Sequence, residues 1–153
     1  DGGWVGERSD VQAVVDWFGP TDFFAIAAEH GNVDDPDLMT ARLVGGPLLE
    51  QRELVELANP ALHVTPNAAP FLIMHGARDR LVPPGQSVIL YDALVEAGVE
   101  AELVILPNKH HEFLGTNAVS RARSFFDRHL KAGSAPAREP VVDGAELRPL
   151  GPA

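Results

Sequence analysis

Two separate segments of the chain contain residue types that can move protons. "PNKHHEF" places His110, His111 and Glu112 side by side, and "HGARDR" contains Asp79, 32 residues before His111. A carboxylate that accepts a hydrogen bond from an imidazole orients the ring, and the oriented ring can deprotonate a hydroxyl nucleophile. Two other interpretations are a metal cluster and a solvated polar loop.

The metal interpretation has little support in the spacing of these residues. Adjacent histidines in an extended loop point in opposite directions, and no His-x-x-x-His pair accompanies His110 and His111. The chain also has no cysteine. We therefore expect no metal ion and no cofactor.

Three short apolar runs precede the loops in which these residues lie. The runs are "VQAVVDWF" (11–18), which is rich in Val and aromatic residues, "PFLIMHG" (70–76) and "AELVILP" (101–107), and each predicts a buried strand. Helical segments alternate with them, so the predicted fold class is α/β, with parallel strands flanked by helices. The loops that follow parallel strands meet at one edge of a sheet, where Asp79 and His111 should lie together.

The helices are predicted from caps and apolar spacing. Thr21 or Asp22 can cap a helix over "FFAIAAEHG", another helix runs from Pro84 to Ala97 before Gly98, and a last one runs over 116–131. The expected apolar stripes are Val88, Tyr91 and Val95 on the second, with Leu90 and Leu94 beside it, and Val119, Ala122, Phe126 and Leu130 on the last.

Two segments depart from this alternation. Residues 34–69 contain helical pieces separated by Gly and Pro, which indicates a cap-like excursion from the scaffold. Residues 133–153 are rich in Pro, Ala and Gly, so we expect a disordered tail there.

Composition excludes two classes of partner. The formal net charge of −10 disfavours nucleic acid, because an acidic chain repels phosphates. No segment approaches the roughly 20 apolar residues that a membrane span needs. The chain opens on a polar Gly-rich loop, "DGGWVGERSD", from which we expect a fragment.

"APFLIMHGARDRLVPPGQSVILYDAL" followed by "GVEAELVILPNKHHEF" resembles the C-terminal half of an α/β-hydrolase. The resemblance is to the esterase/lipase group near the feruloyl and acetyl esterases and the prolyl-oligopeptidase-like hydrolases, and it covers roughly residues 10–131. It implies that Asp79 is the acid and His111 the base of a Ser-Asp-His triad, with Phe113 in the family's aromatic position. Residues 1–132 would then be a partial α/β-hydrolase domain.

The sequence departs from the family in two places. Asn108, Lys109, His110 and Glu112 crowd a loop in which the family has small residues. The family's nucleophile elbow, Gly-x-Ser-x-Gly, is absent, and none of the five serines lies at a glycine-flanked turn after a strand. The nucleophile and the oxyanion-hole loop are therefore expected upstream, in an N-terminal half of the same fold.

These observations predict a serine ester hydrolase fragment that acts on a small-molecule ester and is inactive alone. Peptidase activity is a subordinate option. The alternative is a non-catalytic fragment or pseudoenzyme that pairs with another chain. His75 is expected to pack or hydrogen-bond at a strand end, Trp17 and Phe18 to form core and pocket wall, and His110 to have no direct role.

Overall fold

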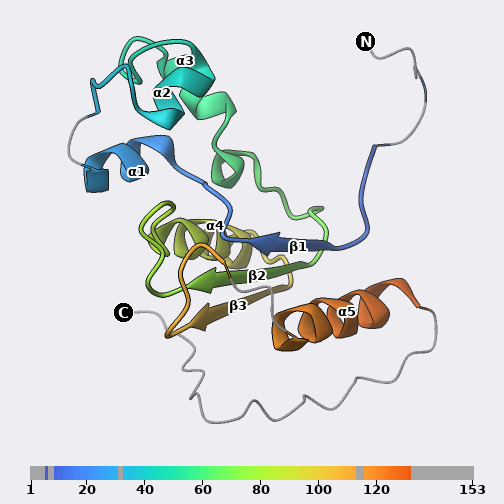
Figure 1. Ribbon diagram of the computed structural model, residues 1–153. Helices are drawn as coiled ribbons and strands as arrows, with labels where there is room; N and C mark the ends of the chain where they lie inside the picture. The colour runs from blue at the N-terminus through green and yellow to red at the C-terminus, as the bar shows by residue number, and fades with distance from the viewer. Residues whose placement is uncertain (1–5, 7–8, 31–32, 113–115, 132–153) are drawn as a thin grey trace.

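The alternation of strands and helices is confirmed by a computed structural model, which describes residues 6, 9–30, 33–112 and 116–131 (Figure 1). Phe113 and the predicted tail at 133–153 lie outside the described residues. In chain order the elements are β1 (Val14–Trp17), α1 (Phe23–His30), α2 (Met39–Val44), α3 (Arg52–Leu57), η1 (Pro60–His63), β2 (Phe71–Gly76), α4 (Gly85–Glu96), β3 (Ala101–Leu106) and α5 (Thr116–Leu130).

The three strands form one parallel sheet in the order β1-β2-β3. Val14 is opposite Phe71, and Phe71 is opposite Ala101, so the strands are nearly level at their start. All three arrows in Figure 1 point the same way, and the loops that follow the strands leave at one edge. β1 is shorter than the predicted 11–18, and the other strands agree with prediction within one residue.

The two faces of the sheet pack against different helices. Ile73 packs with Leu90 and Leu94 of α4, whereas its neighbours Leu72 and Met74 pack with α5. Successive side chains of a strand point to opposite faces, so β2 is buried on both sides, as its continuous apolar run requires.

The predicted apolar stripes of the last two helices are partly wrong. Val95, Val119 and Leu130 are about half exposed. The buried face of α4 consists of Gln86, Ser87, Leu90 and Leu94, and that of α5 includes Ala118, Ala122 and Phe125. The spacing of apolar residues was compatible with burial of either of two neighbouring faces on each helix. Packing against the sheet determines which of the two is buried.

The predicted excursion at 34–69 shares a hydrophobic core with α1, which precedes it. Phe23 and Ile26 of α1 pack with Ala41, Leu48 and Val55 of the following segments. Asp22 caps the start of α1: its Oδ1 accepts a hydrogen bond from the backbone N–H of Ala25 at 3.0 Å. Figure 1 shows α1, α2 and α3 gathered on the β1 side of the sheet.

In the part of the chain that the structure describes, no helix is long and apolar enough to cross a membrane.

Candidate active site

The structure brings Asp79 and His111 into direct contact. Asp79 lies in the loop after β2 and His111 in the loop after β3, and the His111 Nδ1 lies 2.8 Å from the Asp79 Oδ2. A carboxylate accepts hydrogen bonds, so Nδ1 carries the proton of this contact. The Nε2 atom, on the opposite side of the ring, has no hydrogen-bond partner among the described residues and is the position at which a base would act.

The acid is fully buried and its second oxygen is also held. The Asp79 side chain is 0% exposed, and Oδ1 accepts the backbone N–H groups of Leu81 at 2.9 Å and Val82 at 3.0 Å. Burial raises the pKa of Asp79, but hydrogen bonds from Val82, His111 and Leu81 outweigh it and lower the pKa below 3.8. The carboxylate is therefore charged at neutral pH, as orientation of an imidazole requires.

Glycine at position 76 lets the acid loop and the histidine loop approach each other. A Cβ atom at Gly76 would lie 2.6 Å from the carbonyl carbon of Lys109 and would also meet the carbonyl oxygen of His110. The Arg78 N–H donates to the Lys109 carbonyl oxygen at 2.9 Å, and the Ala77 N–H donates to Leu106 at 2.9 Å. The backbone of one loop thus supports the other.

Phe18 forms the wall beside His111. Its ring centroid lies 4.3 Å from that of His111, at an interplanar angle of 45°. Phe18 has φ +49°, in the left-handed region that few bulky residues adopt, directly after β1. His110 and Glu112 are exposed, so the structure separates His111 from its two neighbours in the chain.

His75 contacts the acid, and sequence reasoning missed this contact. His75 is fully buried, with Nε2 3.2 Å from the Asp79 Oδ2 and Nδ1 2.6 Å from the Ser87 Oγ. The sequence predicted only packing or hydrogen bonding at a strand end. The sequence feature that could have predicted this contact is the four-residue spacing of His75 and Asp79 across a tight turn.

The described residues contain no group of three or more His, Cys, Asp or Glu side chains that could hold a metal ion.

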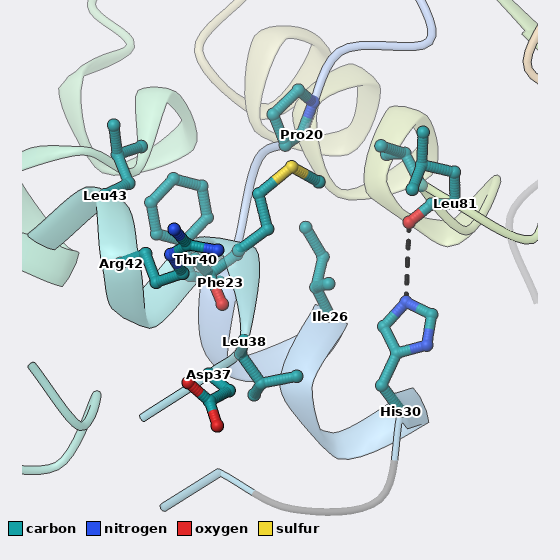
Figure 2. Close-up of a pocket in the computed structure, with 12 residues that line it drawn as sticks. Pro20, Phe23, Ile26, His30, Asp37, Leu38, Thr40, Arg42, Leu43 and Leu81 are labelled. Atoms are coloured by element: carbon teal, nitrogen blue, oxygen red, sulfur yellow. Dashed lines mark hydrogen bonds between the residues drawn. The ribbon is translucent and has the colours of Figure 1, made fainter. Parts of the chain in front are cut away.

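A cavity of about 690 Å³ lies between α1, α2 and the acid loop (Figure 2). Its lining is mostly apolar, and the Nε2 of His30 lies 3.4 Å from the carbonyl oxygen of Leu81 across one side. The acid loop contributes Leu81 and Val82, whose backbone N–H groups hold Asp79. The lining residues are Pro20, Phe23, Ile26, His30, Asp37, Leu38, Met39, Thr40, Arg42, Leu43, Leu81 and Val82.

Comparison with known families shows to which protein family this chain belongs. The model of the BD-FAE family matches residues 4–94, more than half of the chain and including Asp79. The chain belongs to the BD-FAE family of α/β-hydrolases. His111 lies beyond the matched segment of this BD-FAE protein, in the strand and loop that follow it.

Similar proteins are esterases and peptidases. The chain is 36% identical over 77 residues to esterase LipQ of Mycobacterium tuberculosis, covering 50% of this chain and 17% of LipQ. It is 38% identical over 77 residues to dipeptidyl-peptidase 5 of Porphyromonas endodontalis, covering 48% of this chain and 11% of that protein.

The solved structure of a truncated carbohydrate esterase from gut microbiota is 31% identical, with a TM-score of 0.70, covering 78% of this chain and 42% of that one. The BD-FAE chain thus spans less than half the length of each of these relatives, and its three parallel strands match part of an α/β-hydrolase structure.

Proposed function

We propose that this chain supplies the acid, Asp79, and the base, His111, of a serine ester hydrolase. The nucleophile would be a serine outside these 153 residues, in an N-terminal half of the same fold. The observation that carries the proposal is the 2.8 Å contact between the His111 Nδ1 and a fully buried carboxylate. Family membership supports it, because the family consists of esterases and peptidases.

The chemistry assigns one task to each residue. The His111 Nε2 takes the proton of the serine hydroxyl as that oxygen attacks the ester carbonyl, and the same proton then passes to the leaving alcohol. Asp79 keeps the proton of Nδ1 in place and stabilises the imidazolium that forms. Water then attacks the acyl-enzyme with His111 again acting as the base, and His111 passes that proton to the serine oxygen as the carboxylic acid is released.

The proposed substrate is a small-molecule ester. The cavity of about 690 Å³ is in the size range of small-molecule sites and shares Leu81 and Val82 with the acid loop. One relative is named an esterase and one solved structure a carbohydrate esterase, whereas another relative is a dipeptidyl-peptidase. Hydrolysis of an ester is the option that the first two names favour.

The test is hydrolysis of p-nitrophenyl acetate by the protein completed with its N-terminal half. His111→Ala and Asp79→Ala should each lower kcat/KM about 10³-fold or more, because triad members act as a unit. His110→Ala, in the same loop but exposed, should leave most of the activity. The 153-residue chain alone should not exceed a free-imidazole background.

The second candidate is a non-catalytic α/β-hydrolase chain that pairs with another protein. The absence of Gly-x-Ser-x-Gly from the 153 residues favours it. A fluorophosphonate probe separates the two: a labelled serine in the completed protein supports the hydrolase. A completed protein with neither labelling nor turnover would contradict the hydrolase proposal.

A further inference from the structure

The carboxylate of Asp79 contacts two imidazoles, one partly exposed and one fully buried. His111 contacts Oδ2 from the partly exposed side at 2.8 Å, and His75 approaches the same oxygen from the interior at 3.2 Å. The Nδ1 of His75 contacts the Ser87 Oγ, so a buried Ser-His-Asp array lies behind the His111–Asp79 pair. Ser87 and His75 are both 0% exposed, so no substrate can reach this inner array.

The hydrogen bonds of His75 define which nitrogen carries its proton. The Nε2 atom lies 2.9 Å from the carbonyl oxygen of Val82, which can only accept, so Nε2 is protonated. The Ser87 hydroxyl at 2.6 Å then donates to Nδ1 and keeps the ring in this tautomer. The protonated Nε2 therefore donates to the Val82 carbonyl and lies 3.2 Å from the Asp79 Oδ2.

Val82 links this ring to the acid a second time. Its carbonyl accepts from His75, and its own N–H donates to the Asp79 Oδ1 at 3.0 Å. The Val82 side chain lines the cavity. The buried ring of His75 thus contacts the Asp79 carboxylate. It also restrains Val82, the cavity-lining residue that holds the same carboxylate.

We propose that His75, held in one tautomer by Ser87, is a positioning residue that fixes the Asp79 carboxylate toward His111. This inference rests on the proposed roles of Asp79 and His111 as acid and base. His75 touches neither substrate nor nucleophile and acts through Asp79.

The first experiment does not depend on turnover. Proton NMR of the protein completed with its N-terminal half should show the far-downfield Nδ1–H resonance of His111, the signature of its hydrogen bond to a carboxylate. His75→Phe should remove this resonance or shift it upfield while circular dichroism shows a retained fold. His75→Gln, whose side-chain amide can donate in place of Nε2–H, should restore it.

Two further variants complete the test. Ser87→Ala keeps the imidazole but removes the hydroxyl that fixes its tautomer, so it should shift the resonance in the same direction by a smaller amount. If His75→Phe does not fold, Ser87→Ala is measured in its place. His110→Gln, exposed on the neighbouring loop, should change nothing.

In the completed hydrolase, His75→Phe should lower kcat about 10-fold or more with KM within about twofold, and His75→Gln should recover most of kcat. An unchanged His111 resonance in folded His75→Phe, or in Ser87→Ala where that variant replaces it, would overturn the inference. So would failure of His75→Gln to restore the resonance. If the resonance behaves as expected but the completed protein has no activity, the proposed function fails and the positioning role stands.

Discussion

At the scale of single residues, two buried carboxyl groups near the sheet edge are perturbed in opposite directions. Hydrogen bonds hold the pKa of Asp79 below 3.8. Burial raises the pKa of Asp16 above 3.8, against the lowering effect of a hydrogen bond from the Gly19 N–H. The Oδ2 atom of Asp16 is buried and has no hydrogen-bond partner among the described residues. The folded environment therefore stabilises the charged form of Asp79 and destabilises the charged form of Asp16.

The opposite shifts give opposite pH dependence of stability. Asp79 has a lowered pKa in the folded state, so its contribution is present above the unfolded pKa of about 3.8 and is lost as pH falls through the folded pKa. Asp16 has a raised pKa, so its ionisation destabilises the folded state progressively as pH rises from about 3.8 through the folded value.

Asp16→Asn should therefore raise the free energy of unfolding at pH 7 and give no such gain at pH 3. The amide keeps an oxygen that can accept the Gly19 N–H but removes the charge that is costly to bury. Urea unfolding of the protein completed with its N-terminal half, followed by circular dichroism at pH 3, 5 and 7, measures the difference. Asp92→Asn, at an exposed position on α4, is the matched control. An equal gain at pH 3 and pH 7 would contradict the charge explanation.

At the scale of elements, the end of β2 is the point at which the two functional loops meet. Gly76 is the last residue of β2, and the backbone of Lys109 and His110 occupies the space that a side chain would need. The contact is with backbone atoms, which cannot rotate away as a flexible side chain can. A substituent at position 76 must displace either β2 or the loop that carries His111.

Gly76→Ala should lower the free energy of unfolding by about 1–3 kcal/mol, the usual cost of overpacking a closely packed site. It should also weaken the His111–Asp79 hydrogen bond by moving the histidine loop. Chemical denaturation and the Nδ1–H resonance of His111, both measured in the protein completed with its N-terminal half, report the two effects.

Gly85→Ala is the control for this substitution. A Cβ at Gly85 would meet only the Glu29 Oε1 at 3.7 Å, so the change should be neutral or slightly stabilising. Equal destabilisation by both substitutions would show that the close approach at Gly76 has no special cost.

At the scale of the whole molecule, the outer side of β1 has no neighbouring strand in the described part of the chain. β1 pairs with β2 on one side only, and several apolar side chains, among them Val119 and Leu130 on α5, are about half exposed. Unpaired strand edges and exposed apolar surface promote association. The proposed N-terminal half would cover both.

The 153-residue chain alone should therefore self-associate or unfold without one sharp transition. Adding the N-terminal half in trans should suppress light scattering and sharpen the thermal transition. Size-exclusion chromatography with light scattering makes the comparison, with an unrelated acidic protein as the control addition. A stable monomer with one cooperative transition and no response to the N-terminal half would contradict this prediction.

The sequence by itself determined the order of elements and the loops that carry Asp79 and His111. Short continuous apolar runs predict buried strands, and helices that alternate with such strands predict a parallel sheet whose loops leave at one edge. Contact between Asp79 and His111 follows from this topology, and the structure contains it. The catalytic roles of the two residues rest on resemblance and remain proposals.

Only the tertiary structure decided which helix faces are buried and what lies behind the acid. Val95 and Leu94 are equally apolar neighbours on α4, yet one is half exposed and the other fully buried. The inner contacts of His75 depend on Ser87 and Val82, which local sequence patterns do not relate to it. Periodicity describes a single element, whereas burial and shared hydrogen bonds depend on how separate elements pack, and that information is non-local.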